Sequence, residues 1–232
     1  MIKAIIFDFD HTLYDRDASY AKMVPLLAEE LAEYINKDLS IAELTARMSQ
    51  ADRDGAYPHG WPDVYTCKVA AGVFTAAPTY EIYMKAIRTH QPRTITLWSD
   101  TVSTLAALKA RGIKIGMLTN GGSKSQRDKL ANVPEITPYF DEILVGGELP
   151  AQKPHATAYR AICEALGVTP AEAMYVGDHP TNDVEGSKLA GLTAVWIPYV
   201  KPFPANVTPP DHEIAALRDL LPLIDKLNED QE

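Results

Sequence analysis

Cysteine is scarce in this chain of 232 residues, which contains only Cys67 and Cys163. The two positions are far apart and have neither the spacing of zinc ligands nor that of a redox-active pair. A disulfide framework and a cysteine-ligated metal centre are therefore excluded. Both cysteines are expected to be reduced core residues, as in cytosolic proteins.

The chain also lacks an excess of positive charge. Its 22 Lys and Arg residues stand against 31 Asp and Glu residues, so the net charge is −9 and the pI is near 5.2. This balance argues against a general nucleic-acid surface and against binding to anionic membranes. No cationic leader is expected, and long apolar segments, internal repeats and low-complexity tracts are not seen in the sequence. We expect a soluble, cytoplasmic protein with one large domain or two small ones, either a monomer or a homodimer.

The chain is organised around its first expected strand and the turn that ends it. An apolar run, Ile5 to Phe7, leads directly into two carboxylates, Asp8 and Asp10. Such runs are typical of strands buried at the centre of a parallel sheet. Extended backbone would point both carboxylates to one side, at the edge where open α/β sheets bind ligands. The alternative interpretation is that the two carboxylates only form an acidic turn. Three later segments favour a ligand-binding site instead.

A helical segment from residue 15 to about residue 90 interrupts the alternation of strands and helices. Four helices are expected there: residues 19–36, a helix opened by the capping box of Ser40 and Glu43, residues 63–73 and residues 79–89. A loop with Gly and Pro lies between the second and third of them. The predicted domains are a core formed by residues 1–14 and 91–232 and an all-helical insertion formed by residues 15–90.

The alternation resumes after the helical segment, and each apolar run breaks off at a turn. Four further strands are expected at residues 113–118, 142–145, 173–176 and 193–197. Helices are expected over residues 100–111, before the first of these four strands, and between successive strands, which makes five βα-type units. This pattern predicts a parallel sheet with helices on both faces. Residues 198–210 are expected to form a Pro-rich linker before a last helix over 214–227.

Residues suited to handling phosphate follow the expected strands. They are Asp8, Asp10, Thr119, Asn120, Lys153, Asp178 and Asp183. Taken singly, each has an ordinary structural interpretation as a turn residue, a solvated lysine or an acid in the first turn of a helix. Their order and their shared placement after successive strands favour one common site.

Four motifs built from these residues resemble the haloacid-dehalogenase superfamily of phosphohydrolases, subfamily I. The motifs are Asp8-Phe9-Asp10-His11-Thr12, Leu118-Thr119-Asn120-Gly121, Lys153-Pro154 and Gly177-Asp178-His179-Pro180-Thr181-Asn182-Asp183. The resemblance covers nearly the whole chain, and the helical insertion is similar to that superfamily's helical cap of the first type. It implies a Rossmann-like, five-stranded parallel sheet in the order 5-4-1-2-3, with all four motifs at one edge.

The resemblance also implies a metal site, in which Mg²⁺ is held by Asp8, the backbone carbonyl of Asp10, and Asp178. A phosphomonoester is anionic, so a carboxylate nucleophile needs compensating positive charge, which Mg²⁺ and Lys153 would supply. Asp183 is expected either to join the metal site or to orient Lys153 or a metal-bound water.

The catalytic roles follow from the same resemblance and from the chemistry of phosphoryl transfer. Asp8 is the expected nucleophile and would form an aspartyl-phosphate. Asp10 is the expected general acid and then general base. Thr119, Asn120 and Gly121 are expected to hold the transferring oxygens.

Asp10 favours a phosphatase or a phosphomutase. Dehalogenases of the superfamily lack an acid at this position, because a halide needs no protonation. The turn after Asn120, with Ser125-Gln126-Arg127 and Lys129-Leu130, is similar to phosphatases of small metabolites with helical caps. We expect a nucleotide, sugar or sugar-acid phosphate as substrate. A phosphomutase remains an alternative, as does a receiver-like phospho-acceptor domain, although receivers carry the acceptor on the third strand and have no helical insertion.

Substrate choice is expected to depend on the helical insertion, since the core motifs recognise only phosphate. The loop around Tyr57 to Trp61 is the candidate, because the rings of His59 and Trp61 are able to stack on a substrate or bond to it. Packing of this loop between helices is the competing interpretation.

Overall fold

The computed structural model describes residues 1–55, 61–199 and 202–229 and divides the chain into two compact units. One unit comprises Met1–Tyr14 and Leu97–Glu232, and the other comprises Asp15–Thr96. The second unit includes the 3-10 helix Gln91–Thr94, which the sequence interpretation assigned to the core.

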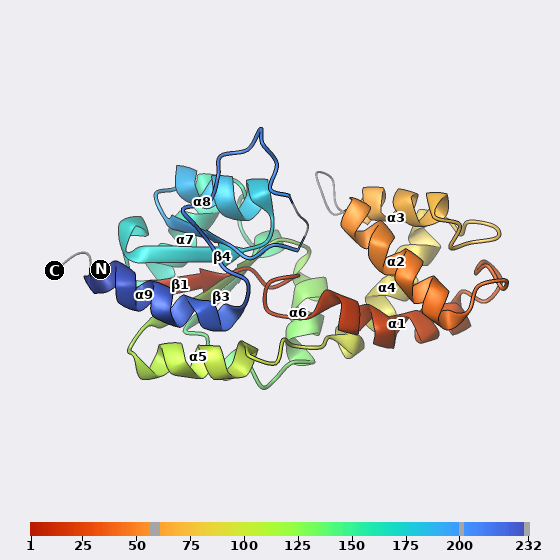
Figure 1. Ribbon diagram of the computed structural model, residues 1–232, viewed down its shortest axis with the longest axis horizontal. Helices are drawn as coiled ribbons and strands as arrows, with labels where there is room; N and C mark the ends of the chain where they lie inside the picture. The colour runs from red at the N-terminus through yellow and green to blue at the C-terminus, as the bar shows by residue number, and fades with distance from the viewer. Residues whose placement is uncertain (56–60, 200–201, 230–232) are drawn as a thin grey trace. The chain divides into compact units, whose positions relative to one another are not determined.

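The first unit is built on a six-stranded parallel sheet (Figure 1), in the order β3-β2-β1-β4-β5-β6. The strands are β1 (Ala4–Phe7), β2 (Lys114–Thr119), β3 (Glu142–Val145), β4 (Ala173–Gly177), β5 (Thr193–Trp196) and β6 (His212–Glu213). The Rossmann-like α/β class is confirmed, and the first five strands have the predicted order.

The sixth strand corrects the predicted number of five. It is only two residues long, His212–Glu213, and pairs with Val195 and Trp196 of β5. So short a strand has no alternation for a sequence pattern to detect. The last helix also begins later than predicted, because the Ile214 N–H still bonds to the Trp196 carbonyl; α9 runs over Leu220–Glu229.

Strand β1 lies in the middle of the sheet because all its residues are apolar and fully buried. Helices cover both faces: α7 (Ala156–Leu166) and α8 (Gly186–Leu189) on one, and α5 (Thr101–Ala110) and α9 on the other (Figure 1). On the α7 side, Ile6 packs with Ile162 and Leu166. Gly116 of β2 lets α7 approach closely, since a Cβ there would lie 2.9 Å from Leu166 Cδ1.

The second unit is helical in its described residues. Its helices are α1 (Arg16–Glu30), α2 (Ile41–Gly55), α3 (Trp61–Ala70) and α4 (Tyr80–His90). The predicted capping box is confirmed: Glu43 Oε2 accepts from the Ser40 N–H at 2.9 Å, and Ser40 Oγ accepts from the Glu43 N–H at 3.3 Å. Helix α1 begins earlier than predicted because Asp15 caps it through the Ala18 N–H.

Helix α1 also ends earlier than predicted. After Glu30 the chain turns, and Ile35 forms an antiparallel bridge with Phe74. Apolar side chains of the helices and of this bridge share one core, which includes Tyr20, Leu27 and Met48. Within the described ranges, none of the helices has the length and apolar character needed to cross a membrane.

Candidate active site

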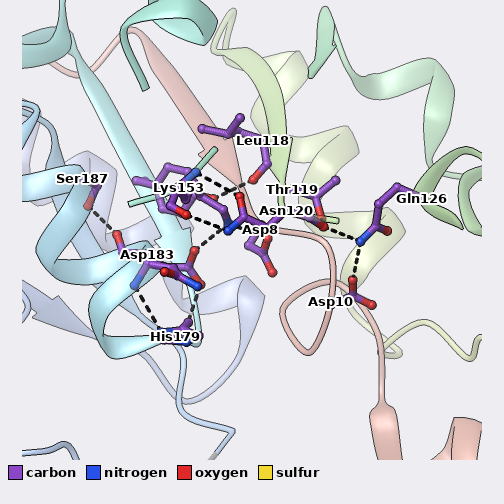
Figure 2. Close-up of polar contacts among 12 residues, drawn as sticks. Asp8, Asp10, Leu118, Thr119, Asn120, Gln126, Lys153, His179, Asp183 and Ser187 are labelled. Carbon is purple, nitrogen blue, oxygen red and sulfur yellow. Dashed lines mark hydrogen bonds and ion pairs between the residues drawn. The ribbon is translucent and has the colours of Figure 1, made fainter. Parts of the chain in front are cut away.

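Lys153 is the centre of a buried polar cluster in the sheet-containing unit (Figure 2). Its Nζ donates to Asp8 Oδ1 and Asp183 Oδ1, both at 2.7 Å, and to the Tyr175 hydroxyl at 2.6 Å. An ammonium group has three N–H donors, so all of them are used. The cluster therefore fixes the position of the lysine and surrounds its charge with two carboxylates.

The strand order brings these residues together at the carboxyl edge of the sheet. Asp8 continues β1, and its N–H donates to the Val176 carbonyl of the neighbouring β4 at 2.9 Å. Asp178 directly follows β4, and its side chain is buried. Lys153 lies just before α7, between β3 and β4 in the chain. This placement is the edge at which open α/β sheets bind ligands.

Asp183 lies in a π-helix, Pro180–Glu185, where the sequence interpretation expected the start of a regular helix. Its Oδ2 accepts from the His179 N–H at 2.9 Å, while its Oδ1 binds Lys153. Gly177 makes room for this carboxylate, because a Cβ at residue 177 would lie 2.4 Å from the Asp183 carboxyl carbon. The Gly-Asp motif is thus needed for close packing as well as for the turn.

The cluster holds more negative charge than Lys153 neutralises. Burial raises the pKa of Asp8 to about 7, and the charges of Asp183 and Asp10 add to this effect, while Lys153 opposes it. Burial would lower the pKa of Lys153, but Asp183 and Asp8 outweigh it and the pKa is raised. Lys153 therefore stays charged, whereas Asp8 needs a further cation to remain ionised at neutral pH.

The buried carboxylates fit a divalent metal ion. Asp8, Asp178 and Asp183 each offer an oxygen, and these oxygens lie within 4.8 Å of one another. Carboxylate oxygens are the ligands that Mg²⁺ prefers. The raised pKa of Asp8 indicates the same need for positive charge. Donor chemistry and charge both fit the Mg²⁺ ion implied by the motifs.

The turn after β2 positions Asn120 toward Lys153. Its Nδ2 donates to the Lys153 carbonyl at 2.8 Å, and its Oδ1 accepts from the Lys153 N–H at 3.0 Å. Thr119 is buried, and its hydroxyl makes a long contact of 3.4 Å with the Asn120 carbonyl. Gly121 has a φ of 118°, a conformation that favours glycine. Thr119 is thus better placed than the Asn120 amide to meet an incoming oxygen.

The side chain of Asp10 lies apart from the polar cluster around Lys153. Figure 2 shows its carboxylate directed toward Gln126 and away from Lys153. The side chains of Lys129, Gln126 and Tyr14 all donate to it. Its side chain is not part of the carboxylate group that could hold a metal.

Four residues that contact these side chains were not assigned a role from the sequence: Tyr14, Gln126, Lys129 and Tyr175. The Tyr175 hydroxyl accepts from Lys153 and donates to the Leu118 carbonyl at 2.7 Å. A tyrosine inside the apolar strand β4 is the one signal that the sequence offered, since a buried hydroxyl needs partners. Gln126 and Lys129 appeared only as part of the resemblance.

Of the two residues proposed from the helical segment, the structure describes Trp61. His59 lies outside the described residues. Trp61 begins α3, and its ring lies 5.3 Å from the Arg16 guanidinium carbon and 5.6 Å from Lys68 Nζ. Trp61 therefore has cationic neighbours within its own unit.

Comparison with known proteins agrees with these motifs. A family model described as haloacid dehalogenase-like hydrolase matches residues 2–191. The glyceraldehyde 3-phosphate phosphatase of Methanopyrus kandleri is 30% identical over 99% of this chain and 100% of its own length. The N-acylneuraminate-9-phosphatase of Rattus norvegicus is 28% identical over 98% of this chain and 95% of its own.

A solved structure has the same fold. The putative HAD-hydrolase YfnB from Bacillus subtilis, bound to magnesium, superimposes with a TM-score of 0.74 at 22% identity. The match covers 97% of this chain and 99% of that one. The likeness thus extends over both units.

Proposed function

Because the chain belongs to the haloacid dehalogenase-like hydrolase family, we propose that it is a Mg²⁺-dependent phosphatase of small phosphorylated metabolites. Family membership confirms the resemblance found in the sequence and the expectation of a hydrolase. The observation that carries the proposal is the buried cluster of Asp8, Asp178 and Asp183 around Lys153. The phosphatases named among its relatives support a phosphomonoester substrate.

Asp8 is the nucleophile in this proposal. Its carboxylate oxygen attacks phosphorus and forms an aspartyl-phosphate as the bond from phosphorus to the leaving alcohol breaks. Asp10 gives its proton to the departing alkoxide. Water then attacks phosphorus, the bond to Asp8 breaks, and Asp10 takes a proton from the water. The products are the alcohol and inorganic phosphate, and both carboxyl groups return to their starting forms.

Lys153 serves the nucleophile in two ways. Its bond to Asp8 Oδ1 fixes the rotation of that carboxylate. Its charge also offsets the repulsion between Asp8 and an anionic substrate. Asn120 holds the backbone of Lys153 through two hydrogen bonds, so we assign it a positioning role. The Thr119 hydroxyl and backbone N–H groups near Gly121 would hold the transferring oxygens.

Asp8, Asp178 and the backbone carbonyl of Asp10 would hold Mg²⁺. When bound, the ion supplies positive charge that stabilises the phosphate oxygens and the ionised carboxylates. Asp183 is within ligand reach, but its two oxygens already bind Lys153 and the His179 N–H. We therefore assign Asp183 to orienting Lys153. The helical unit, Asp15–Thr96, would act as the cap that selects the substrate.

A screen of phosphorylated metabolites for phosphate release tests this function. The purified protein with Mg²⁺ is expected to hydrolyse p-nitrophenyl phosphate and to prefer one class of metabolite, and Asp8→Ala is expected to release none. Failure to release phosphate from any compound would contradict the proposal. Interconversion of sugar phosphates without release would instead indicate a phosphomutase, and a single phosphorylation without turnover would indicate a phospho-acceptor.

A further inference from the structure

The side chains of Lys129, Gln126 and Tyr14 donate hydrogen bonds to the carboxylate of Asp10. Lys129 Nζ lies 2.5 Å from Oδ1 and 2.6 Å from Oδ2. Gln126 Nε2 donates to Oδ2 at 2.8 Å, and the Tyr14 hydroxyl donates to Oδ1 at 2.5 Å. A carboxylate has about four acceptor sites, and these contacts engage both of its oxygens. The direction of the Asp10 side chain is therefore fixed by its neighbours.

Lys129 and Gln126 come from the same face of α6, Ser123–Ala131, since they are three residues apart. Both are only 4% exposed. Burying an ammonium group is costly unless an anion compensates it, and Asp10 provides that anion in its ionised form, which it has after giving up its proton. The helix thus directs a buried cation at the proposed acid–base residue, while Lys124 on the same helix remains 87% exposed.

Gln126 also links Asp10 to the turn after β2, which is proposed to bind the phosphate. Besides Asp10, its Nε2 donates to the Asn120 carbonyl at 2.6 Å. A Cβ at Gly121 would lie 2.9 Å from that same nitrogen. Glycine at residue 121 therefore leaves the space that the Gln126 amide occupies. One amide group connects the turn after β2 with Asp10.

We propose that Lys129 and Gln126 are positioning residues that hold the Asp10 carboxyl group where it can exchange a proton with the leaving group. This inference rests on the phosphatase activity proposed above. The polar cluster around Lys153 does not hold the Asp10 carboxyl group, because Figure 2 shows Asp10 directed away from that cluster. All three donors bind the same carboxylate, but Lys129 is the one of the three that is itself charged, so its contact is the strongest and is expected to persist when Asp10 acts.

The test compares Lys129→Met with Lys124→Met, which removes a charge from the same helix without touching Asp10. The rate of enzyme phosphorylation in a single turnover is measured with an alkyl phosphate and with p-nitrophenyl phosphate. Displacement of a catalytic group by about 1 Å costs about 10²-fold. We expect a loss of this size in the phosphorylation rate of Lys129→Met with the alkyl phosphate. With p-nitrophenyl phosphate the loss should be much smaller, because p-nitrophenolate leaves without a proton. Lys124→Met should match the wild type, and Lys129→Arg should regain most of the rate.

A double-mutant cycle with Asp10→Asn separates positioning from a general structural effect. If Lys129 acts through Asp10, Lys129→Met should cause no further loss in the Asp10→Asn background, whereas independent effects would multiply. Gln126→Leu should show the same pattern with a smaller loss of rate. If Lys129→Met does not fold, Gln126→Leu and Lys129→Arg are used for the test instead.

Equal losses with both substrates, or multiplied losses in the cycle, would overturn the inference. If the wild type is active and Lys129→Met is phosphorylated as fast as Lys124→Met, the inference is overturned while the proposed function stands. A wild type inactive on every phosphomonoester would overturn the proposed function and the inference with it.

Discussion

The side-chain amide of Asn120 and the backbone of Lys153 are joined by two hydrogen bonds, one donated and one accepted by the amide, at 2.8 and 3.0 Å. Both polar atoms of this amide are therefore occupied by the protein itself. The sequence interpretation expected Asn120 to hold the transferring oxygens, whereas these two hydrogen bonds favour the positioning role proposed for it beside Lys153.

Asn120→Ala should accordingly lower kcat by about 10–10²-fold and change KM little, because a small displacement of Lys153 impairs the chemical step. Steady-state kinetics on the preferred substrate measures both constants. Thr119→Val is the matched comparison, since it removes a hydroxyl that would touch the phosphate oxygens. A raised KM with unchanged kcat in Asn120→Ala would show that the amide binds the phosphate directly.

The acids and the lysine of the site were predictable because each follows a recognisable apolar strand. Tyr175 was not, since a tyrosine inside a buried strand is most simply explained as core packing. Its contact with Lys153 depends on how the strands pair. Gln126 and Lys129 were missed for a different reason. Helix α6 is short and polar, so its sequence does not show which face is buried.

Asp178 and Asp183 should respond differently to substitution. Asp178→Asn should raise the Mg²⁺ concentration needed for half-maximal rate and weaken Mg²⁺ binding measured by calorimetry, because it removes a ligand. Asp183→Asn should lower kcat with a smaller change in Mg²⁺ requirement, because Asp183 binds Lys153. Full activity in excess chelator would refute the metal assignment.

The proposed substrate selector consists of His59 and Trp61 in the helical unit. Replacing both by Ala should raise KM for the preferred metabolite much more than KM for p-nitrophenyl phosphate, which lacks the recognised group. Arg16→Met is a useful comparison, since Arg16 lies beside the Trp61 ring and forms a buried ion pair with Asp52. Equal changes for both substrates would exclude the two rings from substrate selection.

Lys68 should make the stability of the helical unit depend on pH. It is fully buried and donates to the Tyr20 and Tyr83 hydroxyls at 2.6 and 2.7 Å. Burial lowers its pKa to about 7, although Asp52 opposes this shift. Between about pH 7 and the ordinary lysine pKa of 10.5, the unfolded chain therefore binds a proton that the folded chain does not. The free energy of unfolding should rise with pH, by at most about 1.4 kcal/mol per pH unit.

Urea unfolding between pH 7 and 9 measures this slope. Lys68→Met should remove it, whereas Lys85→Met, which replaces an exposed lysine of the same unit, should keep it. The tyrosines do not interfere, because burial raises the pKa values of Tyr20 and Tyr83 well above 10 in the folded state. An unchanged slope in Lys68→Met would assign the pH dependence to another group.

Covalent catalysis by Asp8 is the central claim, and chemical trapping tests it most directly. The enzyme is quenched with acid during turnover, treated with borohydride, which reduces an acyl phosphate to an alcohol, and digested for mass spectrometry. The account predicts homoserine at position 8 in samples that contained substrate and Mg²⁺, with an unmodified aspartate in their absence. Continued turnover with position 8 unmodified, or trapping at Asp10 instead, would contradict it.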